Sequence, residues 1–240
     1  MDKGSNMPTG LGTWADWVSG IGSWLAVVVA LGSYWWTERQ RRIEQFERKI
    51  ASANQVGVKL HDLLGRSQTI YNHLFAPYSG PKLHNPMGEE SIWGQTRALV
   101  GLSEQITPDL TPEEHKLLIE IEETDFMTRF SLAWQRHQSI VLSMKEFYIK
   151  RDAVYALMPA PTKIEGYVGQ HEMTREEIMR FMPYSVALEL MIRTTRDMAN
   201  ENYTDLQALA KRFHPTMKKH FPDRKFLMIA EPIGPQESAS

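Results

Sequence analysis

The chain has 240 residues, of which 42% are hydrophobic, and a formal net charge of -2. This content suffices for one folded domain with a hydrophobic core, so disorder over most of the chain is excluded. The absence of cysteine excludes disulfides, thiolate metal sites and cysteine nucleophiles, and the nearly balanced charge excludes a global attraction to nucleic acid.

An uncharged segment runs from Trp17 to Trp36, with aromatic residues at both ends. About 20 helical residues span the ~30 Å hydrocarbon core of a bilayer, and aromatic rings favour its two interfaces. The segment leads directly into Arg39, Arg41 and Arg42 with no small-residue cleavage site, which favours a transmembrane helix over a signal peptide. A buried helix of a soluble core is the alternative.

The orientation of this predicted anchor follows from the basic residues beside it. Lys3 stands alone before the segment, whereas Arg39, Arg41, Arg42, Arg48 and Lys49 follow it. Basic residues stay on the cytoplasmic side. The sequence therefore predicts a single-pass protein of the inner (plasma) membrane, with residues 1–16 as a short extracytoplasmic N-terminus and the chain from residue 37 in the cytoplasm.

Small residues recur along the predicted anchor at helical spacing. They would let a second helix approach closely, as in small-xxx-small motifs, so a homo-oligomer packed through the membrane is one hypothesis. The candidate packing residues are Ser19, Gly22, Ser23, Ala26 and Ala30.

The anchor also carries a resemblance. Trp17-Val-Ser-Gly-Ile-Gly-Ser23 and Leu25-Ala-Val-Val-Val-Ala-Leu31, followed by a basic helix, resemble the N-terminal region of many uncharacterised bacterial or phage-encoded single-pass membrane proteins with a cytoplasmic helical domain. The resemblance is limited to the anchor region. It implies a bacterial inner membrane and an interaction or sensing role, and some relatives of this plan act in phage defence.

Residues 37–75 are predicted to form a juxtamembrane helical stalk. Apolar or small residues alternate at spacings of three and four, the heptad pattern of a helix that packs on another helix. They are Ile43, Phe46, Ile50, Ala53, Gly57, Leu60 and Leu64. Glycine at position 57 costs about 1 kcal/mol relative to alanine, which favours packing in a bundle over a free coiled coil. Prolines and glycines in residues 76–88 then predict a loop.

Residues 89–225 are predicted to form a cytoplasmic helical bundle. A short helix is expected over 89–106. The capping box Thr111-Pro-Glu-Glu114 begins a long central helix that runs to Pro159. A second capping box, Thr174-Arg-Glu-Glu177, begins the last helix, with Pro183 bending its first turns and Pro215 near its end. The predicted fold class is therefore all-α, an up-and-down bundle, with a flexible tail at 226–240.

Candidate catalytic chemistry is sparse. No Glu-x-x-His pair, phosphate-binding glycine loop or Gly-x-Ser-x-Gly motif occurs. His137 and Arg151 occupy core-facing positions of the central helix, where a buried polar group needs a partner, although long polar side chains often reach past such positions to water. An enzyme would need a site that gathers groups such as His137, Arg151 and Glu120. We expect no enzyme activity, no cofactor and no metal site.

Charge is polarised along the bundle, with an acidic region at 89–125 and a basic segment from Lys211 to Lys225 that contains Phe213 and Phe221. Such a basic segment suits anionic lipid headgroups, and nucleic acid is the less favoured partner. A solvated helix end is the alternative reading. The candidate lipid contacts are Arg39, Arg41, Arg42, Lys211, Arg212, Lys218, Lys219, Arg224 and Lys225.

Together these patterns predict a membrane-anchored helical scaffold or signalling protein. It would act through self-association and a cytoplasmic protein partner of unknown identity. The alternative is an effector, for example in phage defence, that perturbs the membrane when its cytoplasmic domain is triggered.

Overall fold

A computed structural model describes residues 14–76, 90–101, 108–158, 163–165, 168–170 and 173–229, without the side chains of 14–23 and 163–170. The chain divides into two compact units, residues 1–50 and residues 51–240. Five helices and one hairpin make up the described part. Their bounds are α1 Trp14–Phe75, α2 Ile92–Gln95, α3 Pro112–Glu120, α4 Thr124–Leu157, β1 Lys163–Glu165, β2 Val168–Gln170 and α5 Arg175–His220.

The predicted all-α class is confirmed. The exception is the short antiparallel hairpin β1–β2, which lies in the predicted loop between the two long helices. Both predicted capping boxes are present. In each, the threonine hydroxyl accepts from the backbone N–H of the glutamate three residues later, and that glutamate accepts from the threonine N–H, at Thr111/Glu114 for α3 and at Thr174/Glu177 for α5.

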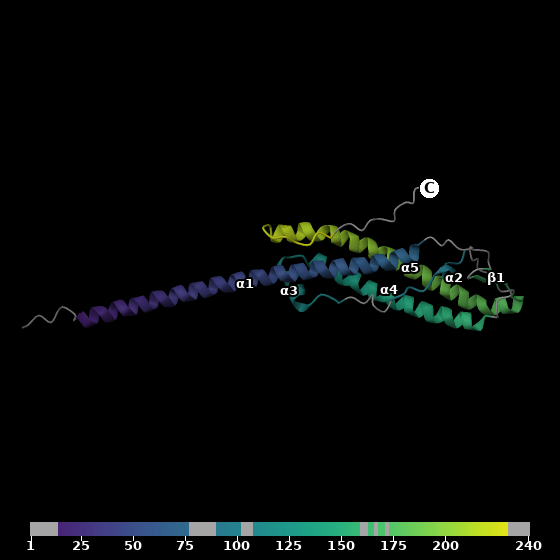
Figure 1. Ribbon diagram of the computed structural model, residues 1–240, viewed down its shortest axis with the longest axis horizontal. Coiled ribbons are helices and arrows are strands. Elements are labelled where there is room, and N and C mark those ends of the chain that lie inside the picture. The colour runs from purple at the N-terminus through teal and green to yellow at the C-terminus, as the bar shows by residue number, and fades with distance from the viewer. Residues whose placement is uncertain are drawn as a thin grey trace, which may run out of the picture. The chain divides into compact units, whose positions relative to one another are not determined.

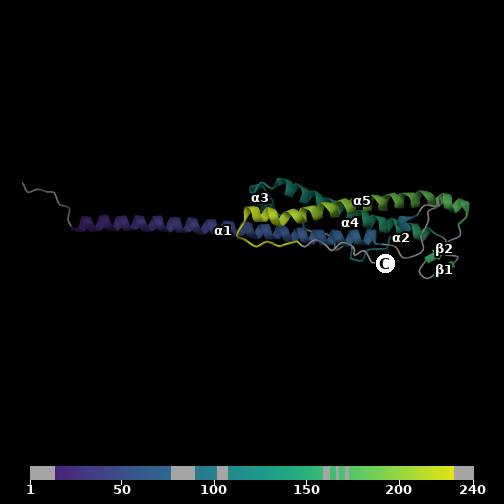
Figure 2. The same ribbon diagram turned by 90° about the horizontal axis from the view of Figure 1, so that it is seen from above.

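The second unit is a bundle of three long helices: α1 from residue 51 onward, α4 and α5, which lie side by side in both views (Figures 1 and 2). Residues 51–75 of the predicted stalk thus belong to the bundle. Its core contains large side chains from all three helices, each less than 2% exposed. Among them are Leu60, Leu63, Ile70, Phe126, Phe130, Phe147, Ile192, Leu206 and Phe213.

The bundle is not a simple up-and-down arrangement, which corrects the predicted topology. Ser67 of α1 lies beside His137 of α4, and six residues later His73 lies beside Tyr148. Residue numbers therefore rise together along α1 and α4, so these two helices are parallel. Only α5 runs antiparallel to them (Figure 1). The chain between α1 and α4 is consequently a long crossover that returns to the level at which the bundle begins.

Gly57 allows α1 to approach α5 closely. A Cβ atom at this position would lie 2.7 Å from Cε1 and Cζ of Phe213, whose side chain is fully buried. This is well inside the ~3.5–4.0 Å at which carbon atoms make favourable contact. The glycine that weakens the helix locally is therefore required by the packing.

The predicted single helix from Thr111 to Pro159 is wrong, because the structure breaks it into α3 and α4. Glu122 has a φ of 58°, in the left-handed region. The backbone N–H of Glu123 donates to Leu118 O at 2.8 Å, and that of Glu122 donates to Ile119 O at 3.0 Å. These two bonds form a Schellman motif, which usually carries glycine at the left-handed residue. Glutamate there gives no sequence signal for the break.

The predicted helix over 89–106 is also largely wrong, since only the four residues of α2 are helical in the described part of this range. Residues 90–99, which we name the strap, are otherwise non-helical. Side chains of α1, α4 and α5 hydrogen-bond to strap backbone groups, including Thr96 O and Leu99 N–H. Such contacts replace the bonds that a helix would make.

The predicted anchor and tail are covered only in part. Residues 17–23 lie outside the residues whose side chains the structure describes, and residues 230–240 lie outside the described chain. Within the described residues, no helix combines the length and the apolar character needed to cross a bilayer. Phe226, in the predicted flexible tail, is buried. Its ring packs against that of Phe221, with 5.8 Å between the two ring centroids.

Candidate functional site

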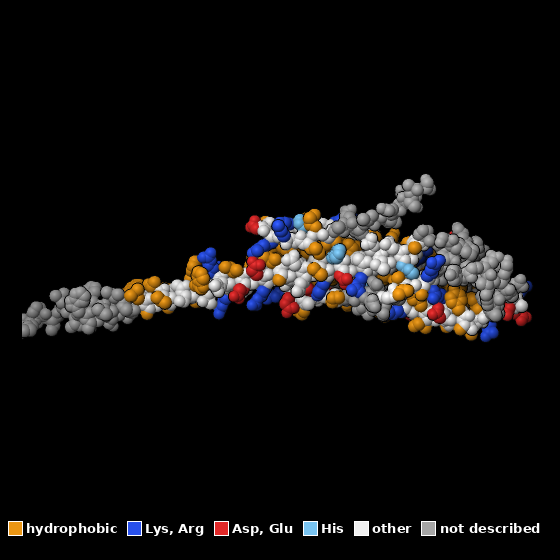
Figure 3. All heavy atoms as spheres, viewed as in Figure 1, with side chains coloured by type: hydrophobic (Ala, Val, Ile, Leu, Met, Phe, Trp, Pro, Cys, Tyr) orange, Lys and Arg blue, Asp and Glu red, His pale blue; other side chains and the backbone are white. Residues whose placement is uncertain are grey.

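The first candidate surface is the N-terminal part of α1. Large apolar side chains from residue 24 to residue 36 are exposed, including Trp24 at 74%, Val29 at 65% and Trp36 at 58% (Figure 3). Of the predicted packing residues, Ala26 and Ala30 are exposed here. Ser19, Gly22 and Ser23 lie outside the residues with described side chains. A helix that is apolar on every face is unusual in contact with water.

The basic residues that follow are exposed on the same helix. The Arg39 guanidinium lies 5.5 Å from the Trp35 ring centroid, and Arg42 pairs with Glu38 at 3.1 Å. Arg41 is also exposed. Ion pairs of this exposed i,i+4 kind contribute only about 0.3–0.5 kcal/mol, so these charges remain able to contact other anions.

The predicted basic segment at 211–225 contains two kinds of residue. Its phenylalanines belong to the core, because Phe213 is 0% and Phe221 is 4% exposed. Arg212 pairs with Asp125 at 2.7 Å, and Lys218 donates to Pro222 O at 3.1 Å. The aromatic part of the predicted lipid-contact motif is therefore not available at the surface. Exposed bases nevertheless remain at Lys211, Lys219 and Lys225, and Arg224 is half-buried.

A second candidate is the buried polar cluster at the centre of the bundle. The Nδ1 atom of His137 lies 3.0 Å from the Ser67 hydroxyl, which accepts from Asn202 Nδ2 at 3.2 Å. None of the three residues is more than 3% exposed. Each of the three long helices supplies one residue. The cluster pairs most of its polar groups inside an apolar core, with Asn202 Oδ1 left without a partner among the described residues, and it fixes the alignment of the helices.

The polar groups named as a potential enzyme site are not gathered together. His137 and Arg151 lie fourteen positions apart on α4, about 21 Å at 1.5 Å per residue. Glu120 lies on α3, where it is 3.9 Å from Lys116. Among the described residues, no group of three or more histidines and carboxylates is arranged to hold a metal ion.

The strap is held to the bundle mainly through its backbone. Glu189 Oε2 accepts from the N–H groups of Ile92 and Trp93 at 3.0 and 3.2 Å. Arg151 Nη1 donates to Thr96 O at 2.7 Å. At the far end, His73 Nε2 donates to Arg97 O at 2.9 Å, and the Tyr148 hydroxyl accepts from Leu99 N–H at 3.1 Å.

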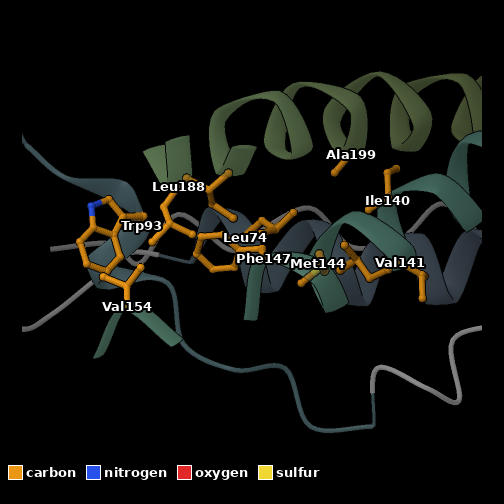
Figure 4. Close-up of a cluster of buried hydrophobic side chains, with 11 residues drawn as sticks. Leu74, Trp93, Ile140, Val141, Met144, Phe147, Val154, Leu188 and Ala199 are labelled. Carbon is orange, nitrogen blue, oxygen red and sulfur yellow. The ribbon is translucent and has the colours of Figure 1, made fainter. Parts of the chain in front are cut away.

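One large apolar side chain of the strap is buried. Trp93 is 8% exposed, its Nε1 donates to the Ser185 hydroxyl at 3.0 Å, and its ring lies 5.7 Å from that of Tyr155. Figure 4 shows it at one end of a cluster of buried apolar side chains, beside Val154 and Leu188. Burial of an aromatic side chain contributes about 2–3 kcal/mol. We name His73, Tyr148, Arg151, Ser185 and Glu189 the strap-binding surface.

The comparisons with known proteins give no further guide. No protein-family model, curated protein or solved structure matches the chain. What can be said of its sites therefore rests on their geometry and chemistry.

The electrostatics of the strap-binding surface follow from its burial. Arg151 lies 5.1 Å from the centroid of the Tyr148 ring and 5.8 Å from that of Tyr155. Burial raises the pKa of Tyr148, although the N–H of Leu99 and the nearby Arg151 favour the anion. The Tyr148 phenol therefore stays protonated at neutral pH and accepts the Leu99 bond as a neutral group.

Sequence reasoning identified one member of this surface and missed the rest. The sequence placed Arg151 on the core-facing side of the central helix, where it either needs a polar partner or reaches past the core to water, and the structure gives it a partner in Thr96 O. Glu189 gave no signal, because it has an arginine four residues later, Arg193, with which it forms a 2.7 Å pair typical of a solvated helix face. Its second carboxylate oxygen holds the strap, a contact between positions 97 residues apart.

Proposed function

We propose that this chain is a single-pass protein of the bacterial inner membrane that tethers a helical bundle on the cytoplasmic side and acts as a scaffold or signalling protein. The observation that carries the proposal is the exposed apolar helix from residue 24 to residue 36. Hydrocarbon is the environment in which such a helix is stable. The arginines after it favour a cytoplasmic location for the rest of the chain.

Self-association is part of the proposal, with a second copy of the chain as the partner of α1. Beyond the apolar stretch, Ile43 is 53% and Phe46 is 42% exposed, on the predicted heptad seam. Arg42 and Glu47 flank this seam at g and e positions. In a parallel pair, Arg42 of one copy would face Glu47 of the other, whereas an antiparallel pair would bring Arg42 toward Arg42. A shared membrane orientation also requires the parallel arrangement.

Membrane insertion is tested by alkaline extraction of bacterial membranes, with protease access to tags at each end measured in spheroplasts. We expect the full chain in the pellet, with only the N-terminal tag cleaved. Val28→Arg should shift protein to the supernatant, because arginine at a helix centre costs about 2.5–3.5 kcal/mol on insertion. Val58→Arg is the matched control, since both valines are 58% exposed but only Val28 lies in the proposed span. Extraction of the unaltered chain would refute the anchor.

The parallel pair is tested by cysteine crosslinking. Because the chain has no cysteine of its own, any disulfide must involve the introduced residue. Ile43→Cys should give a disulfide-linked dimer on oxidation of isolated membranes, since equivalent seam positions approach within disulfide range. Glu44→Cys, on the outward side of the same turn, should not. Equal crosslinking of the two variants would count against the seam.

A further inference from the structure

The strap-binding surface contacts mainly backbone groups of the strap. Five hydrogen bonds to N–H or C=O groups of the strap come from four residues of the surface, Glu189, Arg151, His73 and Tyr148. Any peptide that adopts the same conformation offers those groups. The Ser91 hydroxyl adds only a 3.4 Å contact to Glu189 Oε2, so the surface is selective mainly for a backbone shape, with one exception.

That exception is tryptophan. Trp93 is the strap side chain that is buried within the apolar cluster of the bundle, whereas Ile92 and Leu99 pack against the cluster and are only partly buried. The Trp93 indole N–H donates to the Ser185 hydroxyl. The strap-binding surface therefore selects a large aromatic ring with a hydrogen-bond donor on its edge. A short segment with a tryptophan at the start of a single helical turn fits both requirements.

The strap is separable from the core that it covers. Of the described residues 90–101, only Ser91 and Trp93 are buried, and Val100 is 93% exposed. The remaining buried members of the cluster come from α1, α4 and α5 (Figure 4). A segment with few buried apolar contacts is the kind that opens locally while the rest of a domain stays folded.

We propose that the strap-binding surface is a docking site for a tryptophan-bearing segment of a partner protein, and that the strap occupies it in cis as a displaceable inhibitor. The proposal rests on the proposed function, in which the bundle docks a protein partner, and names the chemistry of that partner. A tethered segment competes at an effective concentration of about millimolar. The partner therefore has to bind tightly enough, at its own concentration, to displace the strap.

The test uses a fluorescein-labelled peptide with the sequence of residues 90–101 and the full chain in detergent micelles. Trp93→Ala should release the strap, so that this variant binds the peptide saturably and at least about tenfold more tightly than the unaltered chain does, as expected for removal of a tethered competitor. Val100→Ala, a control at an exposed position next to the strap, should bind like the unaltered chain. Adding Glu189→Ala to Trp93→Ala should abolish binding.

Two results would overturn the proposal: no saturable binding to a Trp93→Ala chain that retains its helical circular dichroism, or equal binding of a peptide in which the tryptophan is alanine. If Trp93→Ala does not fold, amide hydrogen exchange on the unaltered chain tests whether the strap opens independently of the bundle. Amides of Ile92, Trp93 and Leu99 should exchange faster than those of the α4 core from Ile140 to Phe147. Exchange only with global unfolding would refute a displaceable strap.

These outcomes are independent of the membrane anchor. A chain that binds the peptide but is extracted at alkaline pH would refute the anchor and leave the docking site standing. A chain that stays in the membrane but never binds the peptide would do the reverse.

Discussion

Replacing Gly57 with alanine should destabilise the bundle, whereas the same replacement at Gly65, about two turns further along α1, should stabilise it. At Gly65 a Cβ atom would meet nothing within 4 Å. The exposed helix then gains the full propensity difference, about 0.5–1 kcal/mol. At Gly57 the new atom would lie 2.7 Å from the Phe213 ring.

The Phe213 ring has little freedom to move away. It is fully buried and packs with a ring-centroid distance of 6.2 Å against Phe126, which is itself fully buried. Overpacking of this kind costs about 1–3 kcal/mol. After the gain in helix propensity of about 1 kcal/mol, a net loss of up to about 2 kcal/mol remains for Gly57→Ala. The difference between the two variants cancels the propensity term and isolates the packing term.

The measurement is urea unfolding of the full chain in detergent, followed by circular dichroism at 222 nm. We expect the midpoint to fall for Gly57→Ala and to rise for Gly65→Ala. Phe213→Leu in the Gly57→Ala background should recover part of the loss, because the neighbours are coupled. Equal stabilisation by both alanines would refute the close approach of α1 and α5.

Three further perturbations have defined outcomes. Glu122→Gly should raise the unfolding free energy by about 0.5–1 kcal/mol in the same assay, because glycine removes the left-handed strain; a loss of stability would refute the Schellman break. Hydrogen bonds from two arginines lower the pKa of Asp125 from its usual 3.8. Its contribution to stability is therefore complete above that value and lost as the pH falls through the lowered pKa, so the thermal midpoints of Asp125→Asn and the unaltered chain should converge near pH 2 and differ at pH 6. Lys59→Met removes the ion-pair partner of the fully buried Glu114 and should lower the unfolding free energy by about 3–5 kcal/mol. Lys150→Met removes one member of an exposed pair and should lower it by no more than about 1 kcal/mol. Similar losses of unfolding free energy in the two variants would contradict the buried pair.

The helix starts were predictable because their signals are local. In each capping box, threonine and the glutamate three positions later in Thr-x-x-Glu complete each other's backbone bonds without help from the rest of the fold. The starts of α3 and α5 at Pro112 and Arg175 follow directly from these signals.

The buried face of the central helix differs from the predicted one by a small rotation about the helix axis. The three-four alternation that places His137 and Arg151 on the core-facing side of the central helix also places Tyr155 there, but Tyr155 is 44% exposed, and its neighbour Val154 is 5% exposed instead. The same exchange occurs earlier in the helix, where Ala133 is 1% and Phe147 is 0% exposed. The buried residues therefore keep heptad spacing of three and four along α4, and the buried face as a whole is turned toward these neighbouring positions.

The strap and the parallel direction of α1 and α4 could not be predicted, because both depend on contacts between distant segments. The sequence of residues 89–106 favours a helix locally, but Glu189, Arg151 and Tyr148 hold the backbone between Ile92 and Leu99 in another form. The spatial grouping of these three residues has no counterpart in sequence spacing. The candidate docking site was therefore visible in the sequence only as one arginine on the core-facing side of the central helix.

The polar cluster of Ser67, His137 and Asn202 also constrains how this sequence can evolve. Each residue depends on partners encoded far away in the chain. A single mutation to an apolar residue leaves a buried polar atom without its bond, at a cost of about 1–3 kcal/mol, so substitution one position at a time passes through less stable intermediates. Among homologues, these three positions should therefore change together or not at all, and co-variation at them would trace the bundle in proteins whose surfaces have diverged.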